Sequence, residues 1–118
     1  MTAVTGVAAV LHQPMRGRPI AFGAPGSALW ADGAPVTRDR QPVGTVSRVW
    51  VDGDLVRWTG NLDTPGLAGG HLVGLAELTH STMNTRGTHT VLAGWTISSV
   101  TLVSTASRPW DELHLTVA

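Results

Sequence analysis

Residues 42–60 contain the pattern that most restricts how this chain can fold. Two runs rich in Val, Trp and Thr flank Asp52-Gly53. β-Branched and aromatic residues favour strands, and Asp-Gly favours a two-residue hairpin turn because both residues tolerate a positive φ. The pattern therefore predicts one β-hairpin in a mainly β domain. A two-residue turn at Asp52-Gly53 would place Arg48 opposite Arg57, whereas a three-residue loop would place Arg48 opposite Trp58, and the sequence leaves both open.

Strand patterns recur along the rest of the chain, at residues 4–11, 72–79, 88–93, 95–104 and 113–117. The run 95–104 carries apolar groups on both faces, so we expect that strand to be central and buried. Asp63-Thr64-Pro65 is typical of a helix start and predicts a short helix. Residues 84–87 predict a turn. Residues 13–35, rich in Gly and Pro, predict an extended loop or arm within a single domain of residues 1–118.

The composition excludes several classes of partner. The 118 residues carry a net charge of +0, whereas proteins that bind nucleic acid directly are usually basic. No apolar run approaches the roughly 20 residues that a membrane span needs. We therefore expect neither nucleic acid nor membrane as a partner. Cysteine is absent, which excludes disulfides, thiol catalysis and Cys-ligated metals.

Histidine and serine residues in the second half of the chain raise two questions of chemistry. His71, His80 and His89 are nine residues apart, an odd spacing that puts successive side chains on opposite faces of a strand. That spacing builds no metal site, and we expect no metal and no cofactor. Ser81 is a candidate nucleophile only with a base within hydrogen-bond reach. As the neighbour of Ser81 in a strand, His80 points to the opposite face, whereas His89 could approach across the predicted turn, with Glu77 or a distant Asp as the carboxylate that orients it.

The large aromatic residues divide by their surroundings. Trp50, Trp58 and Trp95 lie within predicted strands, where we expect core positions. Trp30 and Trp110 lie in Pro-flanked loops, where an exposed aromatic side chain favours an interface. Together with residues of the predicted arm, they form the expected partner-contact set: Arg16, Arg18, Phe22, Trp30 and Trp110.

Three segments, taken in order, resemble the phage prohead (capsid maturation) protease family. They are Thr37-Arg-Asp-Arg-Gln-Pro-Val-Gly44 with the hairpin that closes in Gly60-Asn-Leu62, then Val73-Gly-Leu-Ala-Glu77, then Ser99-Val-Thr-Leu-Val-Ser-Thr-Ala106. The matches span about residues 36 to 107. The resemblance implies an α+β, mainly β fold, a compact barrel-like domain with one or two short helices, similar to herpesvirus assemblins.

The chain departs from that family where the family has its catalytic residues. Arg38 or Arg40 stands in place of the catalytic His, Ala76 in place of the nucleophilic Ser, and Ser99 in place of an acidic residue. Alanine supplies no nucleophile, and arginine stays protonated and cannot act as a general base. The resemblance therefore implies a protease-like fold that has lost its catalytic triad.

These features lead to one expected function and two alternatives. We expect a bacteriophage virion structural protein, made in the host cytoplasm, that binds the major capsid protein or further copies of itself and stabilises or decorates the shell. One alternative is an active prohead maturation serine protease that uses Ser81, His80 and His89. The other is a small β module that binds glycan or peptide through exposed Trp side chains.

Overall fold

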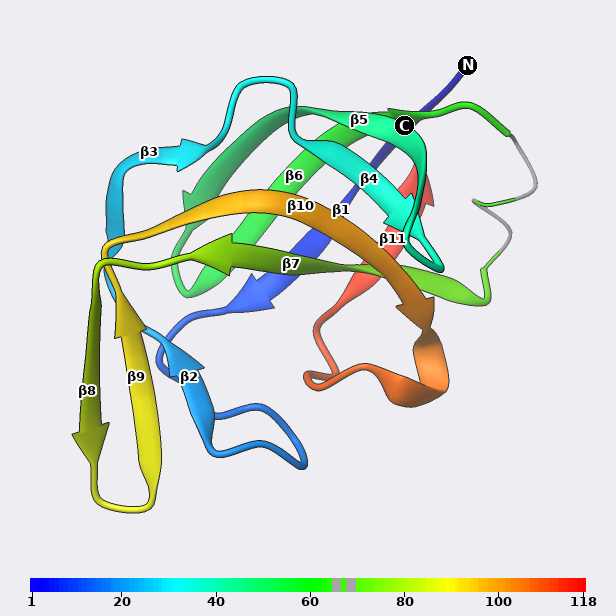
Figure 1. Cartoon of the computed structure of the whole chain (residues 1–118). Helices are drawn as coiled ribbons and strands as arrows, with labels where there is room; N and C mark the ends of the chain where they lie inside the picture. The colour runs from blue at the N-terminus through cyan, green and yellow to red at the C-terminus, as the bar shows by residue number, and fades with distance from the viewer. Residues whose placement is uncertain (65–66, 68–69) are drawn as a thin grey trace.

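The computed structural model describes residues 1–64, 67 and 70–118, and it is mainly β, as the sequence predicts (Figure 1). A 3-10 helix, η2 (Thr105–Ser107), follows β10, and the described residues contain no α-helix. The short helix predicted from residue 63 onward falls on residues 65, 66, 68 and 69, which lie outside the described residues. The strands are β1 (Thr2–Val10), β2 (Ile20–Phe22), β3 (Pro25–Trp30), β4 (Pro35–Arg38), β5 (Gln41–Asp52), β6 (Leu55–Leu62), β7 (Leu72–Thr79), β8 (Thr82–Arg86), β9 (His89–Ala93), β10 (Trp95–Ser104) and β11 (His114–Val117).

The larger sheet has eight strands, ordered β11-β1-β6-β5-β4-β10-β3, with β7 paired to β10. β10 is central, as predicted, because it forms ladders with β3, β4 and β7. The sheet curls until β7 packs against β1 and β11. No ladder joins those edges among the described residues, so the predicted barrel-like sheet does not close. The radius of gyration, 13.5 Å, is that of a compact domain of this length.

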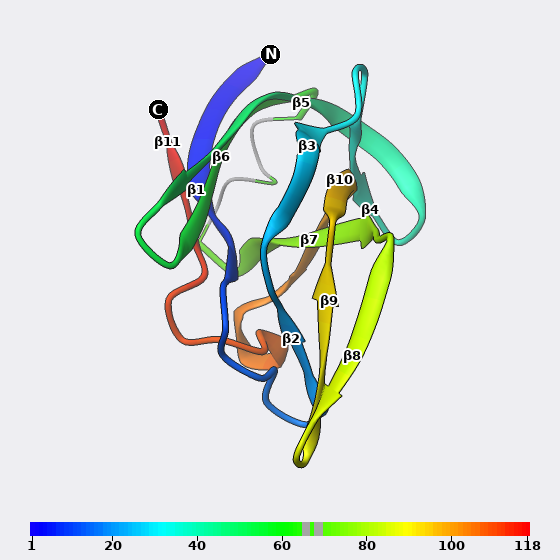
Figure 2. The ribbon, with the colours of Figure 1, turned by 90° about the vertical axis from the view of Figure 1, so that its left-hand side faces the viewer.

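A smaller sheet of three strands, ordered β2-β9-β8, lies at one end of the molecule. Figures 1 and 2 show the β8–β9 hairpin extending beyond the larger sheet. The predicted turn at residues 84–87 is wrong in its position. Arg86 pairs with His89, so residues 84–86 belong to β8 and the chain turns at Gly87-Thr88. Gly87 has a φ of 60°, a conformation that glycine adopts without steric cost, and this places the four-residue turn at 86–89, two residues later than predicted.

The hairpin of residues 42–60 forms as predicted, but in a register that neither expectation gives. Asp52 pairs with Leu55, so the two-residue loop is Gly53-Asp54 rather than Asp52-Gly53. Gly53 has a φ of 61° and occupies the first loop position, which is where a type II′ turn takes glycine. The turn therefore selects the register through the position of its glycine.

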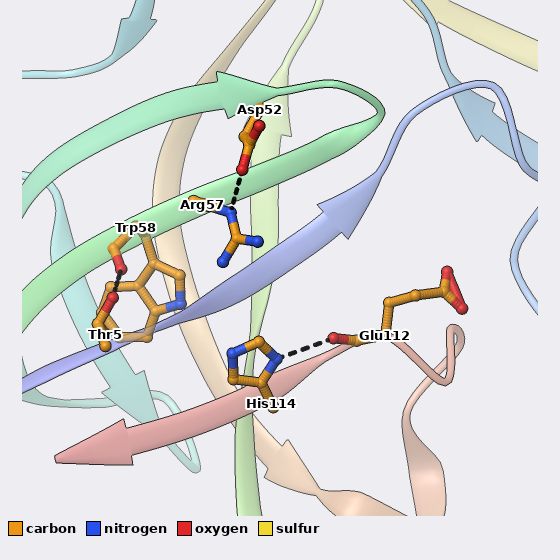
Figure 3. Close-up of polar contacts among 6 residues, drawn as sticks. All are labelled: Thr5, Asp52, Arg57, Trp58, Glu112 and His114. Atoms are coloured by element: carbon orange, nitrogen blue, oxygen red, sulfur yellow. Dashed lines mark hydrogen bonds and ion pairs between the residues drawn. The ribbon is translucent and has the colours of Figure 1, made fainter.

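This register separates the two arginines of the hairpin. Arg48 lies opposite Thr59, and its guanidinium carbon lies 4.8 Å from the centre of the Trp50 ring. Arg57 donates from Nε to Asp52 Oδ2 at 2.8 Å (Figure 3). The opposition of like charges does not arise, because each guanidinium has its own partner on the same hairpin. A three-residue loop would have placed Arg48 against Trp58. The observed cation–π contact is with Trp50 instead.

Trp58 fills the middle of the core between β1, β6 and β7. Its side chain is fully buried, and its indole Nε1 has no hydrogen-bond partner among the described residues. Glycines on these strands leave room for the ring: an added Cβ would lie 2.7 Å from it at Gly74, 2.8 Å at Gly60 and 3.2 Å at Gly6. The backbones approach the indole this closely because these positions carry no side chain.

The Gly and Pro content predicted an extended loop over residues 13–35, but β2 and β3 lie within this segment. β2 forms a parallel ladder with β9, and β3 forms one with β10. The prolines are compatible with these strands because Pro19 precedes β2 and Pro25 is the first residue of β3, positions that need no ladder donor. Two long-range ladders thus override the local composition.

Candidate functional site

The positions that the resemblance assigns to a lost catalytic site lie on or beside neighbouring strands of the larger sheet. Ala76 on β7 and Ser99 on β10 belong to adjacent strands, and Arg38 on β4 donates to the Leu102 carbonyl of β10 at 3.2 Å. Ala76 is buried in the core, whereas Ser99 points to the opposite face and Arg40 lies exposed in the β4–β5 turn with a φ of 69°. The four side chains therefore do not converge on one point, because alternate residues of a strand face opposite ways.

The face opposite to the core carries a cluster of one carboxylate and three hydroxyl groups. Glu77 accepts hydrogen bonds from Thr101 Oγ1 and, at 3.5 Å, from Ser99 Oγ. Thr37 Oγ1 lies 3.1 Å from Thr101 Oγ1. Ser99 thus stands beside an acid contributed by the neighbouring strand. No local sequence signal predicts these contacts of Glu77, because its partners lie 22 and 24 residues away and only the β7–β10 register brings them together.

A cleft of about 590 Å³ lies beside β7, next to this cluster. Among the described strands, β7 forms a ladder with β10 alone, and its other edge has no ladder partner there. The consecutive residues 75–78 all line the cleft. Since consecutive residues of a strand point to opposite faces, the cleft reaches the edge of β7, and the lining residues Thr101 and Val103 of β10 show that it also covers the outward face of the β7–β10 pair. Across from β7 the cleft is walled by Met15, Arg16, Arg18, Ile20, Ser107 and Pro109.

The wall formed by residues 13–20 is fixed to the segment after η2. The Arg16 N–H donates to the Pro109 carbonyl at 3.0 Å, and the Trp110 Nε1–H donates to the Gln13 carbonyl at 2.9 Å. The Arg16 guanidinium also binds the Asp111 carboxylate. This hydrogen bond, and then the positive charge of Arg16, hold the pKa of Asp111 below its ordinary value. Three contacts between segments almost the whole chain apart make this wall a defined part of the cleft.

Two of the expected partner contacts are core residues instead. Phe22 and Trp110 are 3% and 1% exposed, and their rings meet edge to face with centroids 5.5 Å apart. Both lie in Pro- or Gly-rich sequence, but β2 and the Gln13–Trp110 hydrogen bond draw them inside. Arg16 and Arg18 do line the cleft, whereas Trp30 lies half-buried at the far side of the sheet, on β3.

The remaining tryptophans are placed as follows. Trp58 and Trp95 are core residues, as predicted, and both are fully buried. Trp50 is only half-buried, which corrects the expectation of a core position. It faces outward because the register shift at residues 46–48 of β5 interrupts the alternation of that strand, so that Val46 and Val49 both point inward.

The serine–histidine arrangement does not form. The Ser81 N–H donates to the Ala93 carbonyl, while His89 pairs with Arg86 at the other end of the β8–β9 ladder. Residues 89 and 93 are four strand positions apart, or about 13 Å at about 3.3 Å per residue, beyond hydrogen-bond reach. The expected approach of His89 to Ser81 across the turn is therefore wrong. The described residues also contain no group of three or more His, Cys, Asp or Glu side chains that could hold a metal ion.

These observations define a small, mainly β domain with a cleft beside β7. Comparison of the chain with protein-family models, with curated proteins and with solved structures finds no match. Within the described part of the chain, no helix is long and apolar enough to cross a membrane.

Proposed function

We propose that this chain is a non-catalytic structural protein of a bacteriophage particle, made in the host cytoplasm, and that its cleft holds an extended segment of the major capsid protein. The observation that carries the proposal is the place of Ala76. The segment that resembles the nucleophile region of prohead proteases is β7, which lines the cleft, and Ala76, at the position of the nucleophile, is only 4% exposed and has no nucleophilic atom. A capsid segment bound along this strand is held and not cut.

The unpaired edge of β7 supports an extended ligand. Backbone N–H and C=O groups that lack a ladder partner pair readily with an added strand, and pockets for alternate side chains then give specificity. Residues 75–78 provide both the edge and side chains on either side of it. The fixed wall at residues 13–20 limits the cost of ordering on binding.

The lining of the cleft suggests what the segment contains. Met15, Leu75 and Val103 supply apolar surface, while Glu77 and Arg18 supply opposite charges from the two walls. We therefore expect an extended segment with alternating apolar residues and a basic residue that meets Glu77. Because Glu77 and Arg18 are both exposed, their contribution depends on charge and weakens with added salt.

The proposal is tested first on particles. Mature heads purified from infected cells should contain this protein in a fixed ratio to the major capsid protein. A maturation protease acts in the immature head instead, and we expect it to be depleted from mature heads. Absence from mature particles would refute the structural role.

The cleft is tested separately with two charge reversals. Glu77→Arg changes the cleft, whereas Glu112→Arg makes the same change at an exposed carboxylate outside it. Co-sedimentation with assembled capsid protein should fall about tenfold or more for Glu77→Arg, as expected when like charges face each other in a binding site, and should be unchanged for Glu112→Arg. Equal binding by the two variants would exclude the cleft as the capsid site.

A further inference from the structure

β8 (Thr82–Arg86) is an edge strand without the usual protection. It ends the smaller sheet, all of its residues are exposed, and it lies on a hairpin that projects from the larger sheet (Figures 1 and 2). Soluble proteins normally blunt such an edge with Lys, Pro, a bulge or a covering segment. β8 contains neither Lys nor Pro, its ladder with β9 is regular, and Met83 is 62% exposed.

The hairpin geometry shows which backbone groups face outward. Arg86 and His89 close a two-residue loop, so these two residues exchange both of their backbone hydrogen bonds. Bonding alternates along an antiparallel strand, so Asn84 and Thr82 also bond inward to β9. The N–H and C=O groups of Met83 and Thr85 therefore point away from the sheet, where no described strand receives them.

We propose that a second copy of this chain pairs with this edge, β8 antiparallel to β8, about a two-fold axis through Asn84. In this register Met83 of each copy lies opposite Thr85 of the other, and each such pair exchanges both outward hydrogen bonds. Asn84 lies opposite Asn84 of the second copy, in the intervening pair without hydrogen bonds. The two small sheets become one continuous sheet across the axis. This inference does not rest on the proposed cleft, which lies along β7.

Charge and side-chain packing favour this arrangement over a parallel one. Arg86 is the only charged residue of β8, and it stands at one end. Antiparallel pairing sets Arg86 opposite Thr82 of the second copy, whereas parallel pairing in register would set the two Arg86 side chains side by side, which is destabilising. The exposed Met83 gains the methyl group of Thr85 as a neighbour. The sequence of β8 is therefore compatible with antiparallel pairing to itself, and for this reason we assign a second copy of the chain to this edge.

Because one pair of strands buries less than the roughly 1,200 Å² of a stable interface, we expect a weak dimer that forms at high concentration or in an assembly. Cysteine trapping suits such a dimer, since the natural chain has no Cys. In the proposed register, Asn84→Cys brings two thiols together across the axis with Cα atoms about 4.5 Å apart, within the range for a disulfide. Arg86→Cys places its two thiols about 13 Å apart along the strands, which is too far.

Under mild oxidation, Asn84→Cys should give a cross-linked dimer on a non-reducing gel at least about tenfold faster than Arg86→Cys, since only the former meets the geometry of the bond. Both substitutions are at exposed positions, so both proteins should fold. Equal rates for the two variants, or no dimer from Asn84→Cys, would overturn the proposed register.

A charge swap tests the same axis without covalent chemistry. Asn84→Lys and Asn84→Asp each place like charges opposite one another, so each variant alone should sediment as a monomer where the natural chain sediments toward the dimer. An equimolar mixture should regain the dimer, because Lys and Asp then face each other. A mixture that stays monomeric, or single variants that dimerise like the natural chain, would refute the pairing. Neither experiment involves the capsid protein, so a failure here is distinct from a failure of the cleft proposal.

Discussion

Gly74→Ala should destabilise this protein because of one close approach in its core. A Cβ at residue 74 would lie 2.7 Å from Trp58 Cζ2 and 2.7 Å from Val100 Cγ1. Carbon atoms at optimal separation lie about 3.5 Å or more apart, so each contact must lengthen by about 0.8 Å. Trp58 and Val100 are both fully buried, on strands β6 and β10, so neither can swing into solvent to make room.

The expected loss follows from two opposing terms. Adding a methyl group to a well-packed core typically costs about 1–3 kcal/mol, because neighbours leave their preferred rotamers or the backbone shifts. Replacing Gly by Ala restricts the unfolded chain and returns about 0.4–1 kcal/mol. We therefore expect Gly74→Ala to lower the free energy of unfolding by about 1–2 kcal/mol.

Urea denaturation followed by tryptophan fluorescence measures this change. With a slope of about 2 kcal/mol per molar urea, as in small domains, a loss of about 1–2 kcal/mol lowers the midpoint by about 0.5–1 M. The slope itself should stay the same if the unfolded state is unaffected. A midpoint equal to or above that of the natural chain would refute the packing argument.

The Trp58→Phe background provides the matched control. Phenylalanine lacks the benzo ring that the new methyl group strikes, so Gly74→Ala should cost at least about 0.5 kcal/mol less there than beside Trp58. Trp58→Phe also removes the buried Nε1–H, which has no hydrogen-bond partner among the described residues. An identical penalty in both backgrounds would show that the strain lies elsewhere, for example in the β7 backbone.

Two further predictions concern exposed contacts. Arg16→Ala removes the hydrogen bond and the charge that lower the pKa of Asp111, so that pKa should rise toward its ordinary value in a carboxyl titration followed by NMR. Because the pKa of Asp111 is lower in the folded state, the stability from this pair is present above the unfolded pKa and is lost as the pH falls through the folded pKa. In Arg16→Ala the free energy of unfolding should therefore fall less steeply as the pH is lowered through the acid range. An unchanged Asp111 titration would refute the pairing. Arg48→Ala removes the cation over Trp50 and should lower stability by about 0.5–1 kcal/mol, the range for exposed pairs, whereas Arg48→Lys should retain part of it; equal midpoints for all three proteins would refute the contact.

Only some residues of the candidate site could be predicted from the sequence. Arg16 and Arg18 were selected and do line the cleft, because Arg side chains near loops tend to stay at the surface. Phe22 and Trp110 were selected for exposure and are buried, since one hydrogen bond and one aromatic contact between distant segments draw them inward. Glu77 was considered only as an orienting carboxylate for a histidine, and its contacts with the hydroxyl groups of β10 were not predicted. No local signal identifies a carboxylate whose partners come from another strand.

Local sequence signals are enough to predict the mainly β class of this protein and the bounds of some of its strands. β7 and β10 begin and end at the predicted residues because β-branched runs and flanking turn residues act over a few positions. The hairpin register at Gly53-Asp54, the neighbours of β10 and the edges of β7 and β8 that have no partner among the described strands follow from the tertiary structure and not from local signals. These features depend on which strands pair in the sheet. Strand pairing in turn depends on the burial of apolar side chains that lie far apart in the chain. The edges that the structure leaves unpaired are the places where we expect this protein to meet its partners.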